Sequence, residues 1–318
     1  MVGIAHLLTT LLCLSSLSAT NALPQKRVDN STCCGYVVTN RGDAFFNYKH
    51  IIDFSTLTSM DKVYEAGWEV SHGWQAGGEN TLTGQKPIAN ENNVELIRGQ
   101  GLRLKIPRQD KNARTFSVAE VTFPDVMLGA VLELTVQVTK EPGSCMGMFT
   151  LHADSGMERP FGWQDEQDIE ILGSTIFTRN EFQPAGMQMV NYEPSTGAKW
   201  YANQPFPAGI DPSTGFHTYS IAWFPTTSTS NTPRLTEYRF DGQTINRPGG
   251  YPSINPSNLL FNHWTNADGR WSGGPPAKEV YMTIKKVVAY YDKPARMATG
   301  TGILRGSCTR ERACRVTV

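Results

Sequence analysis

Three acidic side chains alternate with other residues in one short segment of the 318-residue sequence. The segment runs from Trp163 to Gly173 and reads WQDEQDIEILG. Its alternation predicts a β-strand, in which successive side chains point to opposite faces. Glu166, Asp168 and Glu170 would then share one face, where like charges repel one another and a covering cleft would remove water from them. A purely structural strand gains nothing from that arrangement, whereas a catalytic site can use it.

The spacing of the outer two carboxylates suits the cleavage of a glycosidic bond. Their Cα atoms would lie roughly 13 Å apart, at about 3.3 Å per residue. Side chains that lean together would bring the carboxyl groups to about 5–6 Å, the separation found in retaining glycosidases, where one carboxylate attacks the sugar and the other acts as acid and then base. Asp168 would lie between them, and mutual repulsion raises the pKa of one member, which keeps a proton available. The alternative interpretation of the spacing alone is a solvated strand face.

The residues around the triplet resemble glycoside hydrolase family 16. The family signature has the form D-E-x-D-x-E followed by an apolar pair and glycine, and Asp165–Gly173 follows it. The resemblance implies an all-β fold, a β-jelly-roll sandwich of two antiparallel sheets with a concave sugar-binding cleft. It also implies retaining chemistry with Glu166 as nucleophile, Asp168 as its helper and Glu170 as acid/base. Further matching segments are FHTYSIAW at 216–223, YRFDG at 238–242, NHWTN at 262–266 and WSGGPP at 271–276, so the resemblance covers about 116–291.

Two positions depart from the family pattern. Position 167 is usually a medium-sized apolar residue, and here it is Gln167, which would face away from the cleft. We therefore expect altered packing behind the strand and preserved catalysis. A tryptophan often stands two residues before the nucleophile, where this chain has Gln164, with Trp163 one place earlier. The single residue between Asp168 and Glu170 leaves no bulge, which resembles lichenases and transglycosylases more than laminarinases.

Aromatic and amide side chains supply candidates for substrate binding. Sugars present apolar faces and a rim of hydroxyls, so a glucan cleft needs aromatic platforms flanked by polar groups. Trp264 and Trp271 fall in segments rich in Gly, Asn and Pro, so we expect both in loops beside the cleft. The other candidates are Phe149, Trp163, Asn191, Tyr192 and Asn262; Phe149 and Trp163 could instead be core residues, and Asn191–Tyr192, which resembles a cleft-lining pair of the family, could be a strand-end turn. We interpret Trp68, Trp200, Tyr219 and Trp223 as packing residues, and His217 as a buried, hydrogen-bonded histidine.

Short strands separated by turns account for most of the remaining sequence. The segment Val131–Val138 alternates as a half-buried strand does. Turn signals such as Pro142-Gly143 and Asp241-Gly242 separate segments of this kind. Their frequency predicts a β-sandwich or jelly roll. The other expected strands are Leu102–Ile106, Met146–His152, Asp168–Leu172, Gln188–Tyr192, His217–Trp223, Leu235–Phe240 and Tyr281–Tyr291.

The sequence divides into four parts. An apolar run at 7–17, LLTTLLCLSSL, is too short to cross a bilayer and predicts a signal peptide over residues 1–22. A loose arm over 23–32 carries a glycosylation acceptor at Asn30. We expect a single catalytic domain over 33–292 and a cysteine-bearing tail over 293–318.

Five cysteines remain once the signal segment is removed, and an odd number leaves one thiol free. Cys308 and Cys314 could pair with each other, or could tie the tail to Cys33 or Cys34. Cys145, next to an apolar stretch, is the candidate for the buried free thiol.

Charge and motifs exclude several classes of function. The 29 basic and 29 acidic residues leave no net charge that would favour nucleic acid or anionic lipid. The sequence contains no G-x-S-x-G elbow, phosphate loop or dinucleotide fingerprint. We therefore expect a secreted, monomeric enzyme that hydrolyses β-1,3-1,4- or β-1,3-linked glucan without a cofactor or metal. The alternatives are a cell-wall glucan transglycosylase with the same acids and a non-catalytic glucan-binding lectin, against which the intact Glu166 and Glu170 speak.

Overall fold

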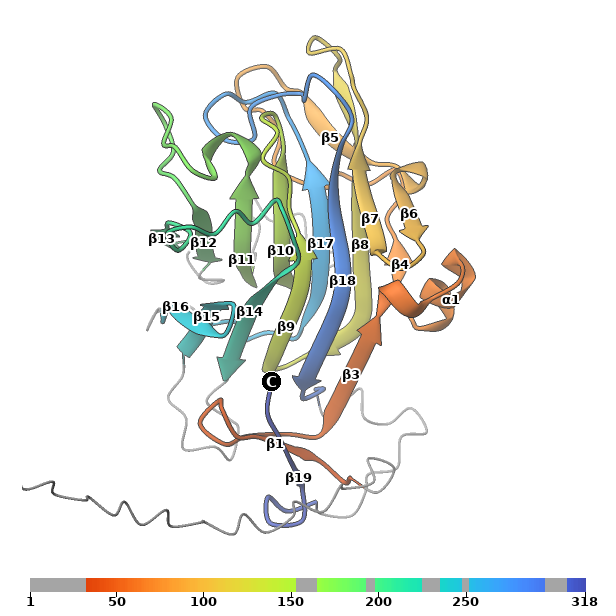
Figure 1. The fold of residues 1–318 in the computed structure, drawn as a ribbon, viewed down its shortest axis with the longest axis vertical. Coiled ribbons are helices and arrows are strands. Elements are labelled where there is room, and N and C mark those ends of the chain that lie inside the picture. The colour runs from red at the N-terminus through yellow and green to blue at the C-terminus, as the bar shows by residue number, and fades with distance from the viewer. Residues whose placement is uncertain (1–32, 153–164, 193–197, 225–234, 248–251, 295–307) are drawn as a thin grey trace, which may run out of the picture. The chain divides into compact units, whose positions relative to one another are not determined.

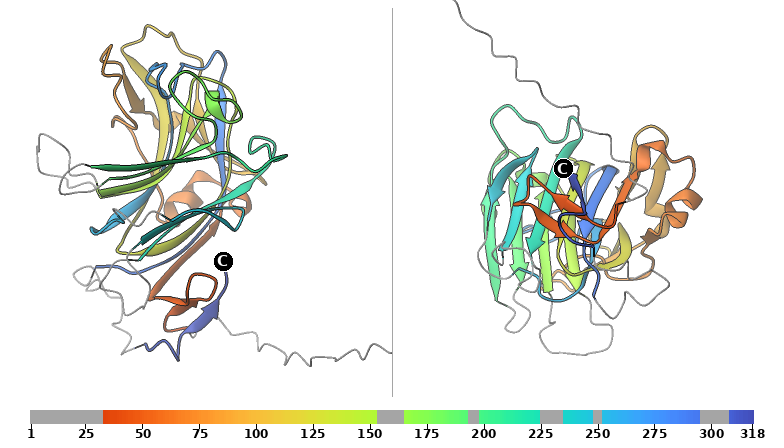
Figure 2. Two further views of the ribbon diagram at one scale, coloured as in Figure 1. Left: turned by 90° about the vertical axis from the view of Figure 1, so that its left-hand side faces the viewer. Right: turned by 90° about the horizontal axis from the view of Figure 1, so that it is seen from below.

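The computed structural model describes residues 33–152, 165–192, 198–224, 235–247, 252–294 and 308–318. Within these residues the chain forms two large β-sheets that pack face to face and a third, small sheet (Figures 1 and 2). Neighbouring strands are antiparallel except in two short pairs, β5 with β8 and β1 with β19. This arrangement confirms the expected all-β sandwich of two antiparallel sheets.

The first sheet carries the acidic segment in its interior. In spatial order it contains β13 (Lys199–Gln204), β12 (Met187–Tyr192), β11 (Asp165–Leu172), β10 (Cys145–His152), β17 (Ser257–Trp264), β8 (Thr115–Met127) and β4 (Glu69–Val70), with β5 (Lys86–Ala89) also paired to β8. The second sheet contains β16 (Gln243–Asn246), β15 (Leu235–Phe240), β14 (His217–Phe224), β9 (Ala130–Gln137), β18 (Val280–Tyr291), β7 (Gly101–Ile106) and β6 (Val94–Ile97), with β3 (Tyr48–Asp53) also paired to β18.

Helical structure is confined to short segments in the described part of the chain. These are α1 (Met60–Glu65) and the 3₁₀ turns η2 (Phe54–Thr56), η3 (Glu91–Asn93) and η4 (Gly173–Thr175). No helix among the described residues is long and apolar enough to span a membrane.

All eight strands expected from alternation are present, and their ends agree within a few residues. The prediction that Trp264 lies in a loop is wrong, because it is the last residue of β17 and is paired with Cys145 of β10. Leu259 and Phe261 of β17 pack in the main core, whereas Trp264 lies on the other face of the strand in a separate buried cluster.

The main core fills the space between the two large sheets. The first sheet contributes a methionine-rich surface that includes Met148, Ile169 and Met189, and the second contributes residues such as Leu134 and Trp223. Apolar burial of this extent provides the main driving force for stacking the sheets. Because side chains alternate, the same strands present their other face to the outside of the sandwich.

The side chain of Gln167 is buried on the core-facing side of β11, as the strand alternation predicted. Its amide nitrogen donates to Thr150 Oγ1 (3.2 Å), and its carbonyl oxygen accepts from the hydroxyl of Thr236 on the second sheet. Asn191 donates to the same Thr236 hydroxyl oxygen (2.9 Å) and accepts from the Tyr238 hydroxyl (2.6 Å). A hydrogen-bonded polar layer therefore replaces apolar packing at this point between the sheets.

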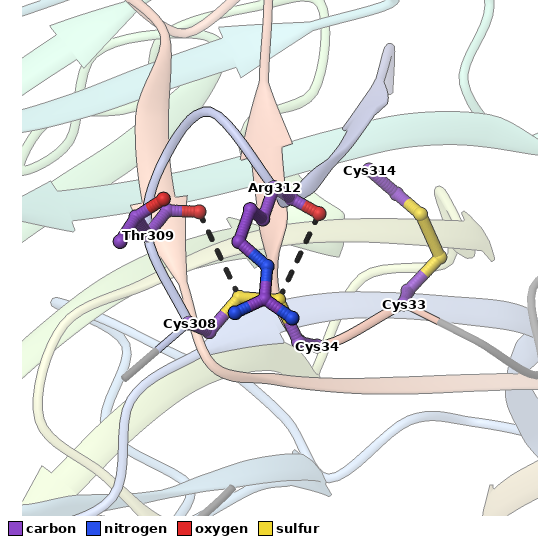
Figure 3. The surroundings of a disulfide bond; sticks show 6 residues. All are labelled: Cys33, Cys34, Cys308, Thr309, Arg312 and Cys314. Carbon is purple, nitrogen blue, oxygen red and sulfur yellow. Dashed lines mark hydrogen bonds between the residues drawn. A yellow bond between two sulfur atoms is a disulfide. The ribbon is translucent and has the colours of Figure 1, made fainter. Parts of the chain in front are cut away.

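Two disulfides tie the small sheet together. This sheet contains β1 (Tyr36–Val38), β2 (Ala44–Phe46) and β19 (Cys314–Val316), and β1 lies between the other two. Figure 3 shows the bonds Cys33–Cys314 and Cys34–Cys308, which join the beginning and the end of the described chain. The pairing of the tail with Cys33 and Cys34 is therefore the correct alternative, and Cys145 is free and buried as predicted.

The small sheet packs on the outer face of the second sheet. Its apolar residues, among them Tyr36 and Phe46, contact Val131, Phe224 and Tyr290. Residues 33–318 accordingly form one compact unit, which includes the described tail residues 308–318. The expected signal peptide, arm and glycosylation acceptor at Asn30 lie outside the described residues.

Candidate active site

The three acidic side chains of β11 point away from the main core into a cleft on the outer face of the first sheet. The register places Asp168 between Phe149 of β10 and Val190 of β12, and Glu170 opposite Gly147 of β10. The cleft has a volume of about 670 Å³, which is within the range of about 300–1,000 Å³ typical of ligand sites. No register shift interrupts the pairing of β11 with β10, so the acids share one face without a bulge.

Asp168 and Glu166 form a hydrogen-bonded pair in which Asp168 holds the proton. Burial, followed by the charges of Glu166 and Glu170, raises the pKa of Asp168 well above its usual value. Burial also raises the pKa of Glu166, to about 7, while the hydrogen bond from Asp168 acts in the opposite direction. Asp168 thus donates to Glu166 and favours the ionised form of the Glu166 carboxyl.

Glu170 occupies a different environment from the other two acids. The thiol of Cys145 donates to Glu170 Oε1 with a distance of 3.2 Å, and the Trp271 side chain donates a second hydrogen bond to the carboxyl. Burial raises the pKa of Glu170, and the two donors oppose this shift, as does the positive charge of Lys199. Glu166 and Glu170, the two ends of the acidic row formed by Glu166, Asp168 and Glu170, therefore differ in their hydrogen-bond donors.

Most of the substrate-binding candidates line the cleft. They are Phe149, Tyr192, Asn262, Trp264 and Trp271. Lys199 Nζ lies 4.8 Å from the ring centroid of Tyr192, which is a cation–π contact at the cleft wall. Trp163 falls outside the described residues.

Trp264 contributes mainly to packing. It exposes only 4 % of its surface and belongs to a cluster with Cys145 and Leu172. Gly77 lies against its indole, where a Cβ atom would approach Trp264 Cδ2 to 2.4 Å. Only a small part of this ring can therefore face a sugar.

The prediction that Asn191 lines the cleft is wrong. Asn191 pairs directly with Gln167 across β11 and β12, and the two side chains lie on the core side of the sheet. Tyr192, one residue later, faces the cleft because successive side chains of a strand point to opposite faces.

Sequence reasoning missed several residues of the cleft, of which Glu120 is the most informative. It lies on β8 opposite Asn262, and its Oε1 accepts a hydrogen bond from Ser71 Oγ (2.8 Å). Burial raises the pKa of Glu120 to about 7, against the effect of hydrogen bonds from Ser71 and Asn262. The alternation of Glu120 with the buried residues Ala119 and Val121 was the available signal. Lys199, Tyr201 and Cys145 were likewise not assigned to the site.

The jelly-roll sandwich and the buried carboxyl row in its cleft have the architecture of a glycoside hydrolase. The sequence profile of the glycosyl hydrolases family 16 matches residues 81–284, and the chain belongs to this family. No curated protein matches the sequence significantly.

Solved structures of the same fold include enzymes with different names. A β-1,3-1,4-glucanase (lichenase) from a mouse hindgut metagenome is 22% identical, with 77% of this chain and 99% of that chain covered and a TM-score of 0.56. The laminarinase catalytic domain of Thermotoga maritima is 19% identical, with 78% and 98% covered and a TM-score of 0.57. The Crh5 transglycosylase is 18% identical, with 78% and 85% covered and a TM-score of 0.51. At these identities the similarity establishes the fold alone.

Proposed function

We propose that the protein is a secreted, retaining endo-β-glucanase that hydrolyses β-1,3-1,4- or β-1,3-linked glucan. The observation that carries the proposal is the arrangement on β11, where Asp168 donates to Glu166 and Glu170 has separate donors in the same cleft. Such an asymmetry suits two carboxyl groups with different roles.

In the first step the Glu166 carboxylate attacks the anomeric carbon and forms a covalent glycosyl ester. Glu170 gives its proton to the glycosidic oxygen, which leaves with the second part of the glucan. In the second step Glu170 removes a proton from water, the water oxygen attacks the same carbon, and Glu166 departs as a carboxylate. Asp168 retains its proton throughout and donates a hydrogen bond to Glu166, which stabilises the carboxylate before attack and after release.

Polar groups of the cleft support a sugar ligand. Asn262 and Glu120, which are joined by a hydrogen bond, place an amide and a carboxyl in the cleft lining, and such groups can bind sugar hydroxyls. Tyr192 and Tyr201 add aromatic surface on the opposite side of the acidic row. The regular register of β11, without a bulge, favours a lichenase-like over a laminarinase-like enzyme by family analogy.

Export to an oxidising compartment is part of the proposal. The chain contains two disulfides. Disulfides persist in oxidising compartments and are rare in reducing ones. We expect residues 1–22 to be removed from the mature protein. N-terminal sequencing of protein recovered from the medium of a secreting host tests this cleavage.

Incubation with barley β-glucan, laminarin and xyloglucan, with products sized by chromatography, tests the reaction. Shorter products alone support hydrolysis, products longer than the donor support transfer, and binding without turnover supports a lectin. Glu166→Gln and Glu170→Gln should each abolish turnover. Glu141→Gln, which changes an exposed carboxylate paired with Lys278, is the matched control and should retain activity.

A 2-fluoro-glucoside that accumulates the covalent intermediate identifies the nucleophile. Mass spectrometry should find the added sugar on the peptide that contains Glu166. A label on any other residue, or wild-type turnover in Glu166→Gln, would overturn the assignment.

A further inference from the structure

We propose that Cys145 and Trp271 are positioning residues that hold the Glu170 carboxyl through two hydrogen bonds. The inference rests on the proposed role of Glu170 as acid/base. It concerns a free thiol and an indole that the reaction itself does not use.

The register explains how Cys145 reaches Glu170. The residue directly opposite Glu170 on β10 is Gly147, which has no side chain, and Cys145 stands two residues earlier on the same face. Diagonal neighbours of this kind lie about 7–8 Å apart at Cα, within reach of a long side chain. The carboxyl of Glu170 extends along that diagonal and brings Oε1 to 3.2 Å from Cys145 Sγ.

The glycine at position 147 leaves room for the Asn262 side chain. A Cβ atom at position 147 would approach the Asn262 side-chain oxygen to 2.4 Å. The Asn262 amide therefore occupies the space over Gly147, while the Glu170 carboxyl lies beside the thiol.

Cys145 remains a neutral donor. Its side chain is fully buried in a cluster with Leu172 and Trp264, and burial together with the charge of Glu170 raises its pKa well above the usual value. The other four cysteines of the described chain are paired in disulfides at the small sheet. The raised pKa favours the protonated thiol, which can donate a hydrogen bond to the Glu170 carboxyl.

Two donors suit a group that must lose and regain a proton in each cycle. Burial favours protonated Glu170, which the first step needs, whereas the thiol and the indole favour the carboxylate, which the second step needs. The bond to Oε1 also restricts rotation of the carboxyl about its own axis, so that its plane is fixed relative to the sugar. Loss of either donor should therefore raise the pKa of Glu170 as well as loosen it.

A carbon-13 titration of the Glu170 carboxyl tests the inference directly. Protein labelled at the glutamate side-chain carboxyl carbon is titrated as wild type, Cys145→Ala, Cys145→Ser and Trp271→Phe, and Glu170→Gln assigns the signal by its absence. We expect the pKa of Glu170 to rise by about 0.5–1 pH unit in Cys145→Ala and in Trp271→Phe, from the net strength of one hydrogen bond. Cys145→Ser restores a donor and should return the pKa to the wild-type value or below.

Val118→Ala is the matched control. Val118 belongs to the same buried cluster as Cys145, so the variant loses packing without removing a donor to Glu170. It should lower the thermal midpoint and leave the Glu170 titration unchanged. The alkaline limb of the kcat/KM profile should move with the titration in the donor variants and stay in place in Val118→Ala.

Unchanged Glu170 titrations in both Cys145→Ala and Trp271→Phe would overturn the inference. If Cys145→Ala does not fold, Cys145→Ser and Trp271→Phe still decide it. Full activity of Glu170→Gln would instead overturn the proposed function, and the titration would still report whether the two donors act on this carboxyl.

Discussion

Removal of one disulfide should cost much less stability than removal of both. Cys33 and Cys34 are adjacent, and their partners Cys314 and Cys308 are close in sequence, so the two bonds close nearly the same long loop, with separations of 281 and 274 residues. While either bond is present, the other closes only a small ring made of the two adjacent cysteines and the short segment between their partners.

The expected magnitudes follow from the entropy of loop closure. A ring of about nine residues corresponds to roughly 2.5 kcal/mol, and a loop of roughly 280 residues to about 5.5 kcal/mol. The paired change Cys34→Ala with Cys308→Ala should therefore lower the free energy of unfolding by about 2.5 kcal/mol, and replacement of all four cysteines should lower it by about 8 kcal/mol. The larger loss is comparable to the whole stability of an ordinary domain, about 5–15 kcal/mol.

Urea unfolding of the wild type, the two single-bond variants and the four-cysteine variant measures these differences. Cys33→Ala with Cys314→Ala is the second single-bond variant and should resemble the first. Equal contributions of the two bonds, so that the double loss is only twice the single loss, would refute the shared-loop reasoning. A single-bond loss of about 5 kcal/mol would refute it as well.

Three further changes test the acidic row, the cleft wall and the polar layer. Burial raises the pKa of Glu120 from 4.5 to about 7, so the folded state binds this proton more tightly than the unfolded state and loses stability as pH rises through that interval. Glu120→Gln should thus match the wild type in urea unfolding at pH 4 and exceed it at pH 8, by at most about 3 kcal/mol; lower stability at pH 8 would contradict this sign. Asp168→Ala removes the donor to Glu166 and should lower kcat/KM about 10- to 100-fold, whereas Asp168→Asn keeps a donor and should lose less; equal losses would exclude the donor role. Gln167→Leu leaves Thr236 without its acceptor and should cost about 1–3 kcal/mol in unfolding experiments with kcat/KM unchanged; a loss of activity without a loss of stability would place Gln167 in the site.

Alternation was sufficient to predict the strands that have one buried face. On β9 the core residues Leu132 and Leu134 alternate with residues of the outer face, so both the strand and its orientation follow from the sequence. The pairing of β1 with β19 could not be predicted in this way. Both strands have three residues, and they are brought together by packing and disulfides between the two ends of the described chain.

The acidic row on β11 and the other cleft residues differed in how far the sequence could predict them. The position of Glu166, Asp168 and Glu170 on one face of a strand needed only the alternation of β11 and the family resemblance. The error at Asn191 arose because a resemblance to a two-residue pair was applied to both members, although adjacent residues of a strand cannot share a face. Glu120 was missed because its partners Ser71 and Asn262 come from distant parts of the sequence.

The carboxyl groups of the cleft would favour a neutral polymer over an acidic one. Among the described residues that line the cleft there are six carboxyl groups and a single lysine. Glu79 and Asp268 form ion pairs with Lys86 and Arg270, so the acidic groups that remain are Glu120 and the row on β11, which shares the single charge of Lys199.

Because burial raises the pKa values of Glu120 and Glu166 to about 7, the negative charge of these two groups develops as the pH rises through that value. A polymer that carries uronate or sulfate groups would then be repelled on entry, most strongly at low ionic strength, while a neutral glucan would enter without this penalty. The same carboxyl groups that we propose to cut a neutral glucan would thus exclude acidic polymers from the cleft.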